Sequence, residues 1–571
     1  MCLPPHFCSH ANTVSEPFRA FVLPSTAYAL ALTHEHALGW DYTSTTAPSK
    51  VHCLPLPFGL KRSDPLPLGS VVRSGPSSEF GLVVVAPTTG KVTFWENVDS
   101  AEARSHLPQR HQGVDGSVGR MLSGETIVDI VDVEHAGYVL IFSTGRLAQL
   151  TLRDSQGRPH INVYFLRNGS GGGGGFFGNL KSALGGGLRR EIASVKARPS
   201  ESKGQMEIIT ASKTGIFQLW DLSWAGQHIF KGEVDTYAEL LATLRDSNPS
   251  ELQGQQDVKV LDFAILRSPK TRGMEVSLSG TPESVGLLML VALAEPSHLS
   301  YSLVEVDLIE NSAVVQRVIP LHAYHQEQIP KEPAAKLLLP PPGHTALVQF
   351  NDAIVVASLA ESEESPDTQL MSDTGKPPLP FQDTIYFRKD SNVQFVGSAL
   401  EDLGRKDKQS SCIFFIRGFG IMQVTALPPT DDDQAIERQR VTALSKLEQA
   451  TFFSAKPENI LDFSIKSRYN FEQEEVQQAA EHISSNILSS SSEFIEVATS
   501  SMEDQLKKRS AALKNLALHL RSDYPPLSFS TRWILLWNAE KMAAALQVWR
   551  HYDERMQLKD VEQRQIGRAH V

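Results

Sequence analysis

The chain has 571 residues, of which 41% are hydrophobic and 21% charged, so it can bury a large core and form more than one domain. Its formal net charge of -11 excludes a surface devoted to nucleic-acid phosphates, which requires a strongly basic face. We therefore expect no direct contact with nucleic acid. The cysteines are too few and too scattered for a disulfide framework or a zinc site, which favours a reducing compartment. They are Cys2, Cys8, Cys53 and Cys412.

The N-terminus lacks the pattern of a secretory signal. Its first apolar stretch, residues 21–32, is interrupted by Pro24 and has no basic flank. The longest apolar run, Gly286 to Ala294, has about half the length that a bilayer-spanning helix requires. We expect residues 1–16 to form a disordered tail, and any contact with a membrane to come from the protein surface.

Residues 17–430 contain short β-branched runs separated by turn residues, which predicts an all-β domain. Three segments align closely with one another. In each, an apolar strand reaches a Thr-Gly turn, and buried-type residues stand two and five positions beyond the glycine. Glycine suits this turn because it adopts a positive φ without a Cβ penalty. The aligned segments are 83–95, 139–150 and 208–220.

Weaker copies of this strand-turn-strand unit give turn centres near residues 35, 90, 145, 215, 297, 352 and 418. Units at this spacing fit seven four-stranded blades, with the extra length placed in loops. The sequence therefore predicts a seven-bladed β-propeller. Two stacked β-sandwiches would also show many short strands, but radial closure explains one uninterrupted β region better.

The pattern changes to amphipathic helices after the acidic run Asp431-Asp432-Asp433. Apolar residues recur at spacings of three and four in 434–455, 473–491, 501–521 and 529–560. Successive helices predict the start of an α-helical solenoid in residues 434–565, so the fold class is β followed by α. Residues 566–571 lack the pattern and match a translated sequencing adapter. We expect them to be a non-native tail and the native helical region to be longer.

A glycine-rich loop, residues 168–192, lies between the third and fourth repeats and gives the sharpest functional signal. Five glycines, Gly171 to Gly175, precede apolar residues that recur every four positions. Folded as a helix, these residues form one apolar stripe. The only charge between the glycines and Arg189 is Lys181. The stripe consists of Phe176, Phe177, Leu180, Leu184 and Leu188.

The energetics of this stripe predict a membrane-binding segment. Its glycines, at positions 178, 185, 186 and 187, each cost about 1 kcal/mol relative to alanine in a helix, so the helix should not persist in water. Burying the five apolar side chains returns on the order of 7–15 kcal/mol as an upper bound. With one lysine, binding depends on apolar insertion, which favours membranes whose packing is loosened by curvature.

Other interpretations of the loop are a flexible segment that docks on the propeller or on a partner, and two nucleotide sites. Gly173, Gly175 and Gly178 satisfy the dinucleotide pattern G-x-G-x-x-G, but a run of glycines satisfies almost any glycine pattern, and no βαβ unit surrounds it. Residues 175–182 resemble a P-loop, except that Leu180 stands where the second glycine is required. We expect no cofactor and no small-molecule substrate.

Other candidate sites are weaker. His34-Glu35-His36 offers two imidazoles but lacks the spacing of a zincin and falls at a hairpin turn, so we expect a solvated turn and no metal. Asn168-Gly169-Ser170 is a glycosylation sequon without meaning outside the secretory pathway. No catalytic Ser/His/Asp, Cys/His or paired-carboxylate arrangement stands out. A propeller enzyme would need ionisable residues clustered at one end of its central channel.

Three features together resemble the 133/155-type nucleoporin N-terminal family. They are the run from Phe21-Val22-Leu23-Pro24-Ser25 to Ala37-Leu38-Gly39-Trp40-Asp41-Tyr42, the glycine-rich loop, and the segment 446–453 (KLEQATFF) followed by Asn459. The similarity covers residues 17–560. The 133-kilodalton, outer-ring branch fits better than the inner-ring 155 branch because the position and composition of the loop match.

This resemblance implies a non-enzymatic scaffold of the nuclear pore complex at the nuclear envelope, supporting mRNA export and protein import. It implies a propeller that faces the curved membrane through loop 168–192, and a helical region that binds other outer-ring nucleoporins. A vesicle-coat or membrane-tethering scaffold of the propeller–solenoid type is the alternative, and it would localise to secretory membranes instead.

Overall fold

The computed structural model divides the chain into two compact units. The first spans Met1–Pro380 and Val393–Thr430, and the second spans Phe381–Asn392 and Asp431–Val571. The expected tail, residues 1–16, lies outside the residues that the structure describes. Those residues are 17–22, 27–43, 50–73, 80–105, 113–167, 191–247, 257–266, 284–294, 299–309, 312–324, 333–360, 380–389, 393–401, 410–426, 441–454, 459–463, 471–495 and 501–569.

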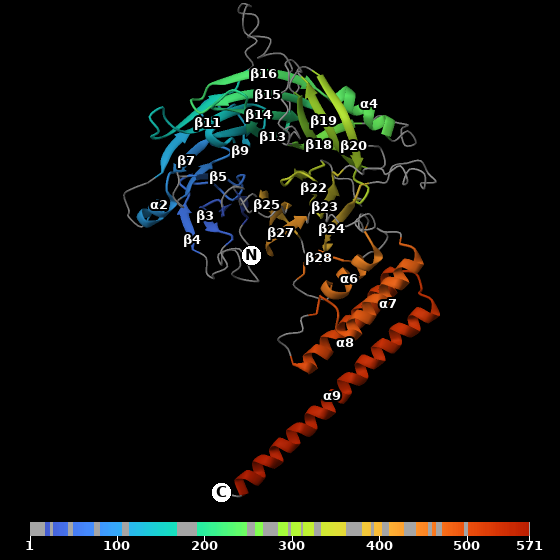
Figure 1. The fold of residues 1–571 in the computed structure, drawn as a ribbon. Coiled ribbons are helices and arrows are strands. Elements are labelled where there is room, and N and C mark those ends of the chain that lie inside the picture. Colours follow the sequence, from blue (N-terminus) through green and yellow to red (C-terminus); the bar gives the residue numbers. More distant parts are fainter. Residues whose placement is uncertain are drawn as a thin grey trace, which may run out of the picture. The chain divides into compact units, whose positions relative to one another are not determined.

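The strands of these described ranges form seven antiparallel sheets, which are the predicted blades (Figure 1). Blade 1 contains β1 (Arg19–Val22), β2 (Tyr28–Leu32), β3 (His36–Asp41) and β4 (Val51–Pro55). Blade 2 contains β5 (Leu68–Arg73), β6 (Phe80–Val85), β7 (Lys91–Trp95) and β8 (Val114–Ser117). Blade 3 contains β9 (Ile127–Asp132), β10 (Tyr138–Phe142), β11 (Leu147–Arg153) and β12 (Pro159–Phe165).

The remaining blades continue in the same strand order. Blade 4 contains β13 (Ile192–Pro199), β14 (Gln205–Ser212), β15 (Ile216–Ser223) and β16 (His228–Asp235). Blade 5 contains β17 (Asp257–Ile265), β18 (Ser284–Ala294), β19 (Leu299–Ile309) and β20 (Ser312–Pro320). Within the first unit, blade 6 contributes β21 (Lys336–Leu338), β22 (Thr345–Gln349) and β23 (Ala353–Ser358), and blade 7 contains β25 (Phe395–Glu401), β26 (Ser410–Ile416) and β27 (Gly420–Ala426).

The predicted turn centres all fall between the strands of a central hairpin. Gly145, for example, joins β10 to β11 with a φ of 81°, and Gly215 joins β14 to β15 with a φ of 82°. A residue with a Cβ would be strained there. The repeat found in the sequence is therefore the central hairpin of each blade, and the seven-bladed propeller is confirmed.

Blade stacking explains why the central strands are apolar on both faces. In β6, Val83 and Val85 pack in the core between blades 2 and 3, whereas Leu82 and Val84 pack in the core between blades 1 and 2. Alternate side chains of a strand point to opposite faces. Each blade is thus covered by a neighbour on both sides, and the hydrophobic core of the first unit lies between blades.

The inner strands form a ring that closes between blade 7 and blade 1. Consecutive inner strands contact one another from β1 to β21, and β25 contacts β1. Closure relies on side chains: Trp40 meets Phe415 edge to face, with ring centres 6.2 Å apart. Ala20 and Ile413 lie in the same buried cluster. Figure 1 shows the blades following one another from β3 (blue) through β16 (green) to β20 (yellow-green).

In the described part of the first unit, two short helices interrupt the β pattern, and they were not predicted from the sequence. α2 (Val98–Ser105) lies between β7 and β8, and α4 (Tyr237–Ser247) lies between blades 4 and 5. Each is too short to show a clear helical period against the surrounding strands. Leu240 and Leu244 of α4 nevertheless join the core between blades 4 and 5.

The second unit is mainly helical. It contains β24 (Gln382–Phe387), α6 (Ala443–Phe453), β28 (Leu461–Asp462), α7 (Gln473–Ser489), α8 (Met502–Asp523) and α9 (Phe529–Ala569), and β24 pairs with β28. α6 begins at Ala443, after the predicted residue 434, because Thr442 accepts the Ser445 amide hydrogen and caps the helix. α7 and α8 lie where the apolar spacing predicted them, and α9 begins at the predicted residue 529 but continues past the predicted end at 560 to Ala569.

The helices of the second unit share one core. Leu447, Ile483, Leu513, Leu516 and Met542 are buried together from all four helices. α9 packs on α7 and α8, and Figure 1 shows it extending beyond them. Among the described helices, none combines the length and the apolar content needed to cross a bilayer.

Candidate functional site

The predicted membrane-binding side chains lie outside the described residues. Phe176, Phe177, Leu180, Leu184 and Leu188 all fall within residues 168–190. The structure does describe the stem of this loop, which is β12 with Leu166 and Arg167 on one side and Glu191 with β13 on the other. β12 is the outer strand of blade 3 and β13 is the inner strand of blade 4, so the loop connects two blades.

The stem opens on the face that carries the central hairpin turns, here called the turn face. Antiparallel strands bring the segments that connect successive blades to this face, and backbone hydrogen bonds join them to the turns. The Val118 amide donates to the Gly90 carbonyl at 2.8 Å, and the Lys213 amide donates to the Glu191 carbonyl at 2.9 Å. Gly90 and Lys213 belong to the turns of blades 2 and 4, so the glycine-rich loop starts and ends on the turn face.

Arg146 holds the first end of the stem. Its guanidinium carbon lies 4.1 Å from the ring centre of Phe165, the last residue of β12. Arginine over an aromatic face is attracted by the ring quadrupole. The same guanidinium pairs with Glu125, with 3.0 Å between Nη1 and Oε2. The turn of blade 3 and the stem are therefore joined through one side chain.

Glu125 is the buried partner of this arrangement. Its side chain has 0% exposure, and it accepts hydrogen bonds from the Leu122 amide at 2.9 Å, from the Thr144 hydroxyl and from Arg146. A buried carboxylate is tolerated when it is paired and hydrogen-bonded in this way. Sequence reasoning missed it because no local pattern marks it: Thr144 and Arg146 lie 19 and 21 residues away along the chain.

The second end of the stem is held more loosely. Glu191 and Lys213 form an ion pair at 2.6 Å, and their side chains are 57% and 40% exposed. The hydrogen bond from Lys213 lowers the pKa of the Glu191 carboxyl. Because exposed pairs contribute little to stability, the backbone bond between the same two residues is the main restraint.

The structure corrects the prediction for His34-Glu35-His36. The prediction of a solvated turn is wrong for His34, which is only 4% exposed. Its Nε2 bonds to the Asp64 carbonyl at 2.9 Å, because the segment between blades 1 and 2 folds over the turn. Glu35 is exposed. Within the described ranges, no group of three His, Cys, Asp or Glu side chains is placed to hold a metal ion.

The strands that flank the glycine-rich loop do not form the unit that a nucleotide-binding site requires. Gly173, Gly175 and Gly178, and the P-loop-like residues 175–182, lie outside the described residues. β12 and β13 belong to two different antiparallel sheets. A dinucleotide fingerprint needs a parallel βαβ unit, so the surroundings of the loop do not favour a nucleotide site.

Charged residues also gather in the central channel, where an enzyme of this fold would place its site. Inner-strand residues such as Lys196, Lys336 and Leu337 line a cavity of about 1370 Å³. Lys196 Nζ lies 3.0 Å from Asp262 Oδ1, and Asp262 Oδ2 accepts the Leu337 amide hydrogen at 2.8 Å. Lys336 Nζ donates to the Ser398 carbonyl at 2.8 Å. These contacts tie β13, β17, β21 and β25 together, which indicates a structural role.

Loss of hydration among the inner strands disfavours the charged forms of two residues. It raises the pKa of the Asp129 carboxyl, although Asp129 keeps contact with solvent, and it lowers the pKa of the Lys336 ammonium. Partial compensation comes from nearby opposite charges, which include Lys336 and Arg19 for Asp129. Keeping the Asp129 and Lys336 side chains charged therefore costs the fold some stability.

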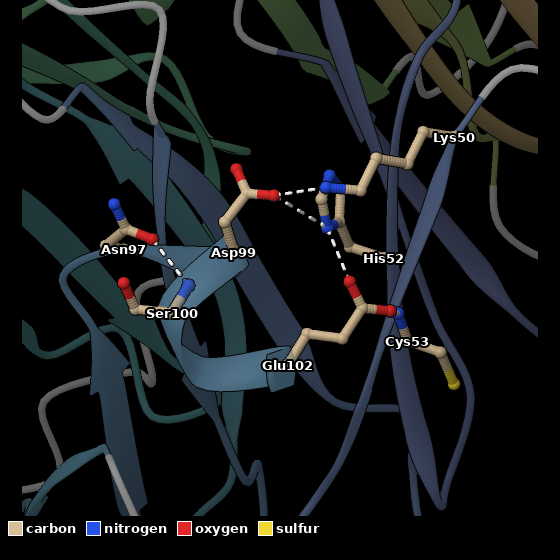
Figure 2. A network of polar contacts seen from close by, with 7 residues as sticks. All are labelled: Lys50, His52, Cys53, Asn97, Asp99, Ser100 and Glu102. Carbon is tan, nitrogen blue, oxygen red and sulfur yellow. Dashed lines mark hydrogen bonds and ion pairs between the residues drawn. The ribbon is translucent and has the colours of Figure 1, made fainter. Parts of the chain in front are cut away.

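A polar network fastens α2 of blade 2 to the outer strand of blade 1 (Figure 2). Glu102 Oε2 lies 2.8 Å from His52 Nδ1, and Glu102 Oε1 accepts the Cys53 amide hydrogen at 3.2 Å. Asp99 pairs with Lys50 beside it. An outer strand exposes unpaired backbone groups, and the carboxylate of Glu102 satisfies one of them on β4.

The two cysteines in the described ranges are free thiols. Burial raises the pKa of Cys412 to about 12 and, with the charge of Glu102, also raises the pKa of Cys53. Thiols of this kind are unreactive compared with activated cysteines. Cys2 and Cys8 lie outside the described residues.

Stacked blades around a channel of internally paired charges, followed by packed helices, define a propeller–helix scaffold. The family model described as "Nup133 N terminal like" matches residues 1–423, and the chain belongs to this nucleoporin family. The family assignment confirms the resemblance found in the sequence. Nucleoporins of this type are structural components of the nuclear pore.

Curated relatives and a solved structure support the assignment. The chain is 36% identical to nucleoporin NUP133 of Chaetomium thermophilum over 93% of this chain and 40% of that protein. It is 21% identical to nucleoporin nup132 of Schizosaccharomyces pombe over 83% of this chain and 38% of that protein. The chain thus spans about 40% of the length of these relatives.

The fold is shared with the crystal structure of the Vanderwaltozyma polyspora Nup133 β-propeller domain. The TM-score is 0.51 at 20% sequence identity, with 70% of this chain and 91% of that chain covered. At this identity the likeness concerns the fold alone.

Proposed function

We propose that this chain is the N-terminal part of a scaffold protein in the outer ring of the nuclear pore complex, at the nuclear envelope, which supports mRNA export and protein import. Family membership and the propeller fold support this role. The charged atoms of the channel are engaged between neighbouring strands, as suits a structural protein.

In this proposal, loop 168–192 anchors the propeller to curved nuclear-envelope membrane through its apolar stripe. The attachment of the loop stem supports this part of the proposal. Both of its ends are bonded to the turn face, one through Phe165 and Arg146 and the other through Glu191 and Lys213. A segment tethered at two points loses less entropy when it folds against a surface, and its glycines prevent a helix from forming beforehand.

The helical unit is the expected contact with other outer-ring nucleoporins. α9 carries large apolar side chains on the surface, including Phe529, Trp533 and Trp537, which are 76%, 57% and 55% exposed. They recur every four residues and so share one face of the helix. Aromatic residues at such positions are typical of protein interfaces.

Localisation of the full-length protein tests the scaffold role. A fluorescently tagged protein should stain the nuclear rim in a punctate pattern and co-purify with outer-ring nucleoporins. Staining of secretory membranes without the rim would favour a coat or tethering protein and would contradict the proposal.

Vesicle binding tests the loop. The chain should bind small neutral phosphatidylcholine vesicles more tightly than large ones, and the double substitution Leu180→Asp and Leu184→Asp should abolish binding without changing the melting temperature. A matched control is Ser182→Asp, which adds a charge to the polar face of the same predicted helix. Equal binding to both vesicle sizes would remove the curvature claim.

A further inference from the structure

We propose that the segment between blades 2 and 3, together with the base of the loop stem, is a second membrane-contact surface that binds the phosphate headgroups of an anionic bilayer. We call it the connector patch, and it consists of Arg120, Leu122, Arg146 and Arg167. The inference rests on the proposed function, because loop 168–192 is what brings the turn face to a membrane.

The connector presents one apolar side chain to solvent on a rigid turn. Met121 points inward and packs against the core between blades 2 and 3, whereas Leu122 is 55% exposed. The turn is closed in both directions, since the Glu125 amide donates to the Leu122 carbonyl at 3.1 Å and the Leu122 amide donates to Glu125 Oε2 at 2.9 Å. A side chain held on a fixed turn loses little entropy when it inserts into a bilayer surface.

The connector and the base of the loop stem carry exposed positive charges. Arg120 and Arg167 are exposed, and the side chain of Arg146 is 31% exposed. Glu125, the carboxylate of this connector, is fully buried under Arg146. The chain as a whole carries a formal charge of -11, so the positive charge of the patch is a local feature. Cations close to an anionic leaflet are attracted to it, and each strengthens binding about fivefold.

Direct contacts place the patch beside the loop stem. Arg146 Nη1 donates to the Arg120 carbonyl at 3.3 Å, and its guanidinium carbon lies 4.1 Å from the ring centre of Phe165 in the stem. The connector and the loop stem therefore lie side by side on the turn face. The apolar stripe has Lys181 as its one charge, so the patch supplies the electrostatic attraction that the stripe lacks.

Binding of the whole chain to small vesicles of equal size, with and without phosphatidylserine, tests the patch. The wild-type chain should bind the anionic vesicles more tightly, and added salt should reduce this gain because it screens exposed charges. The double substitution Arg120→Glu and Arg167→Glu should weaken binding to anionic vesicles about tenfold or more, while binding to neutral vesicles stays nearly unchanged. Leu122→Ser alone should give a smaller loss on both.

Two controls separate this inference from the proposed function. Lys203→Glu reverses an exposed charge in the turn between β13 and β14, on the face opposite the turn face, and should change nothing. The loop substitutions Leu180→Asp and Leu184→Asp should remove curvature-dependent binding to neutral vesicles. If the connector-patch double substitution leaves the gain on anionic vesicles intact, or reduces binding equally on neutral and anionic vesicles, the patch is not a headgroup site.

Discussion

Gly397 in β25 packs directly against the backbone of Ala20 in β1. A Cβ at Gly397 would lie 2.2 Å from the Ala20 carbonyl oxygen, a separation that forces the backbone to move. These residues belong to the last and first blades, so the propeller ring closes where two inner strands approach too tightly for any side chain. Buried aromatic packing between Trp40 and Phe415 completes the same junction.

The first prediction follows from this contact. Gly397→Ala should lower the free energy of unfolding by about 3 kcal/mol, because overpacking against backbone cannot be relieved by a rotamer change. Chemical denaturation monitored by tryptophan fluorescence measures the loss. Gly119→Ala is the matched control, since nothing lies within 4 Å of the added Cβ. If both variants were equally stable, ring closure would not depend on Gly397.

The second prediction concerns the ion pair at the loop stem. Arg146→Ala leaves the buried carboxylate of Glu125 without its cation, so we expect a loss of about 3–5 kcal/mol. Arg158→Ala removes an exposed pair with Asp154, in which Arg158 is 70% exposed, and should change the stability little. Thermal denaturation of both variants compares them directly, and equal losses would mean that burial of Glu125 does not matter.

The third prediction is that two aspartates, Asp129 and Asp154, change the stability in opposite directions as the pH rises. Loss of hydration among the inner strands raises the pKa of Asp129 above its ordinary value of 3.8 although the residue keeps contact with solvent, so its ionisation lowers stability as the pH rises from that value through the raised pKa. Asp129→Asn should therefore raise the melting temperature slightly at pH 7, and this difference should vanish at a pH below 3.8. The carboxamide oxygen introduced by this substitution can still accept the Ile130 amide hydrogen, as the Asp129 carboxylate does.

Asp154 is the counterpart. Its hydrogen bonds with the Arg158 backbone and side chain lower its pKa from the ordinary value of 3.8. The ionised Asp154 carboxylate therefore stabilises the fold at a pH above 3.8, and this stabilisation is lost as the pH falls through the lowered pKa. Asp154→Asn should reduce the melting temperature slightly at neutral pH and not in acid. Melting curves from strongly acidic to neutral pH decide both cases, and parallel curves for the two variants would contradict the assignment.

The fourth prediction concerns the network between α2 and β4. Burial and, after it, the charge of Glu102 raise the pKa of Cys53. Glu102→Gln removes that charge and weakens the bond to His52, so the Cys53 thiol should react faster with a maleimide. Cys2→Ser and Cys8→Ser in the background restrict labelling to Cys53, because Cys412 is buried.

Asn97→Gln is the control for this labelling experiment. It alters a neighbouring hydrogen bond of α2, in which the Ser100 amide donates to Asn97 Oδ1 at 2.7 Å, and it leaves the charge beside Cys53 in place. The labelling rate of this variant should match that of the wild-type chain. An unchanged rate in Glu102→Gln as well would argue against the coupling between Glu102 and the thiol.

The glycine-rich loop illustrates how a candidate site can be found from sequence alone. The spacing of Phe176, Leu180, Leu184 and Leu188 predicts a helical stripe without any knowledge of the fold. Its attachment was not predictable, because Arg146, Phe165 and Glu125 meet only after the strands of blade 3 have paired. The arginines and the leucine of the connector patch come together with the loop stem only in that folded sheet.

The amino-acid sequence by itself determined the number of blades, the positions of their central turns and most of the helices. These features depend on periods of two or four residues and on glycines that take a positive φ, as at Gly145 and Gly215. Only the tertiary structure decided how the ring closes, where Asp262 and Lys196 pair, and that His34 is buried. Those outcomes depend on contacts between residues far apart in the chain, and neither local propensity nor spacing encodes them.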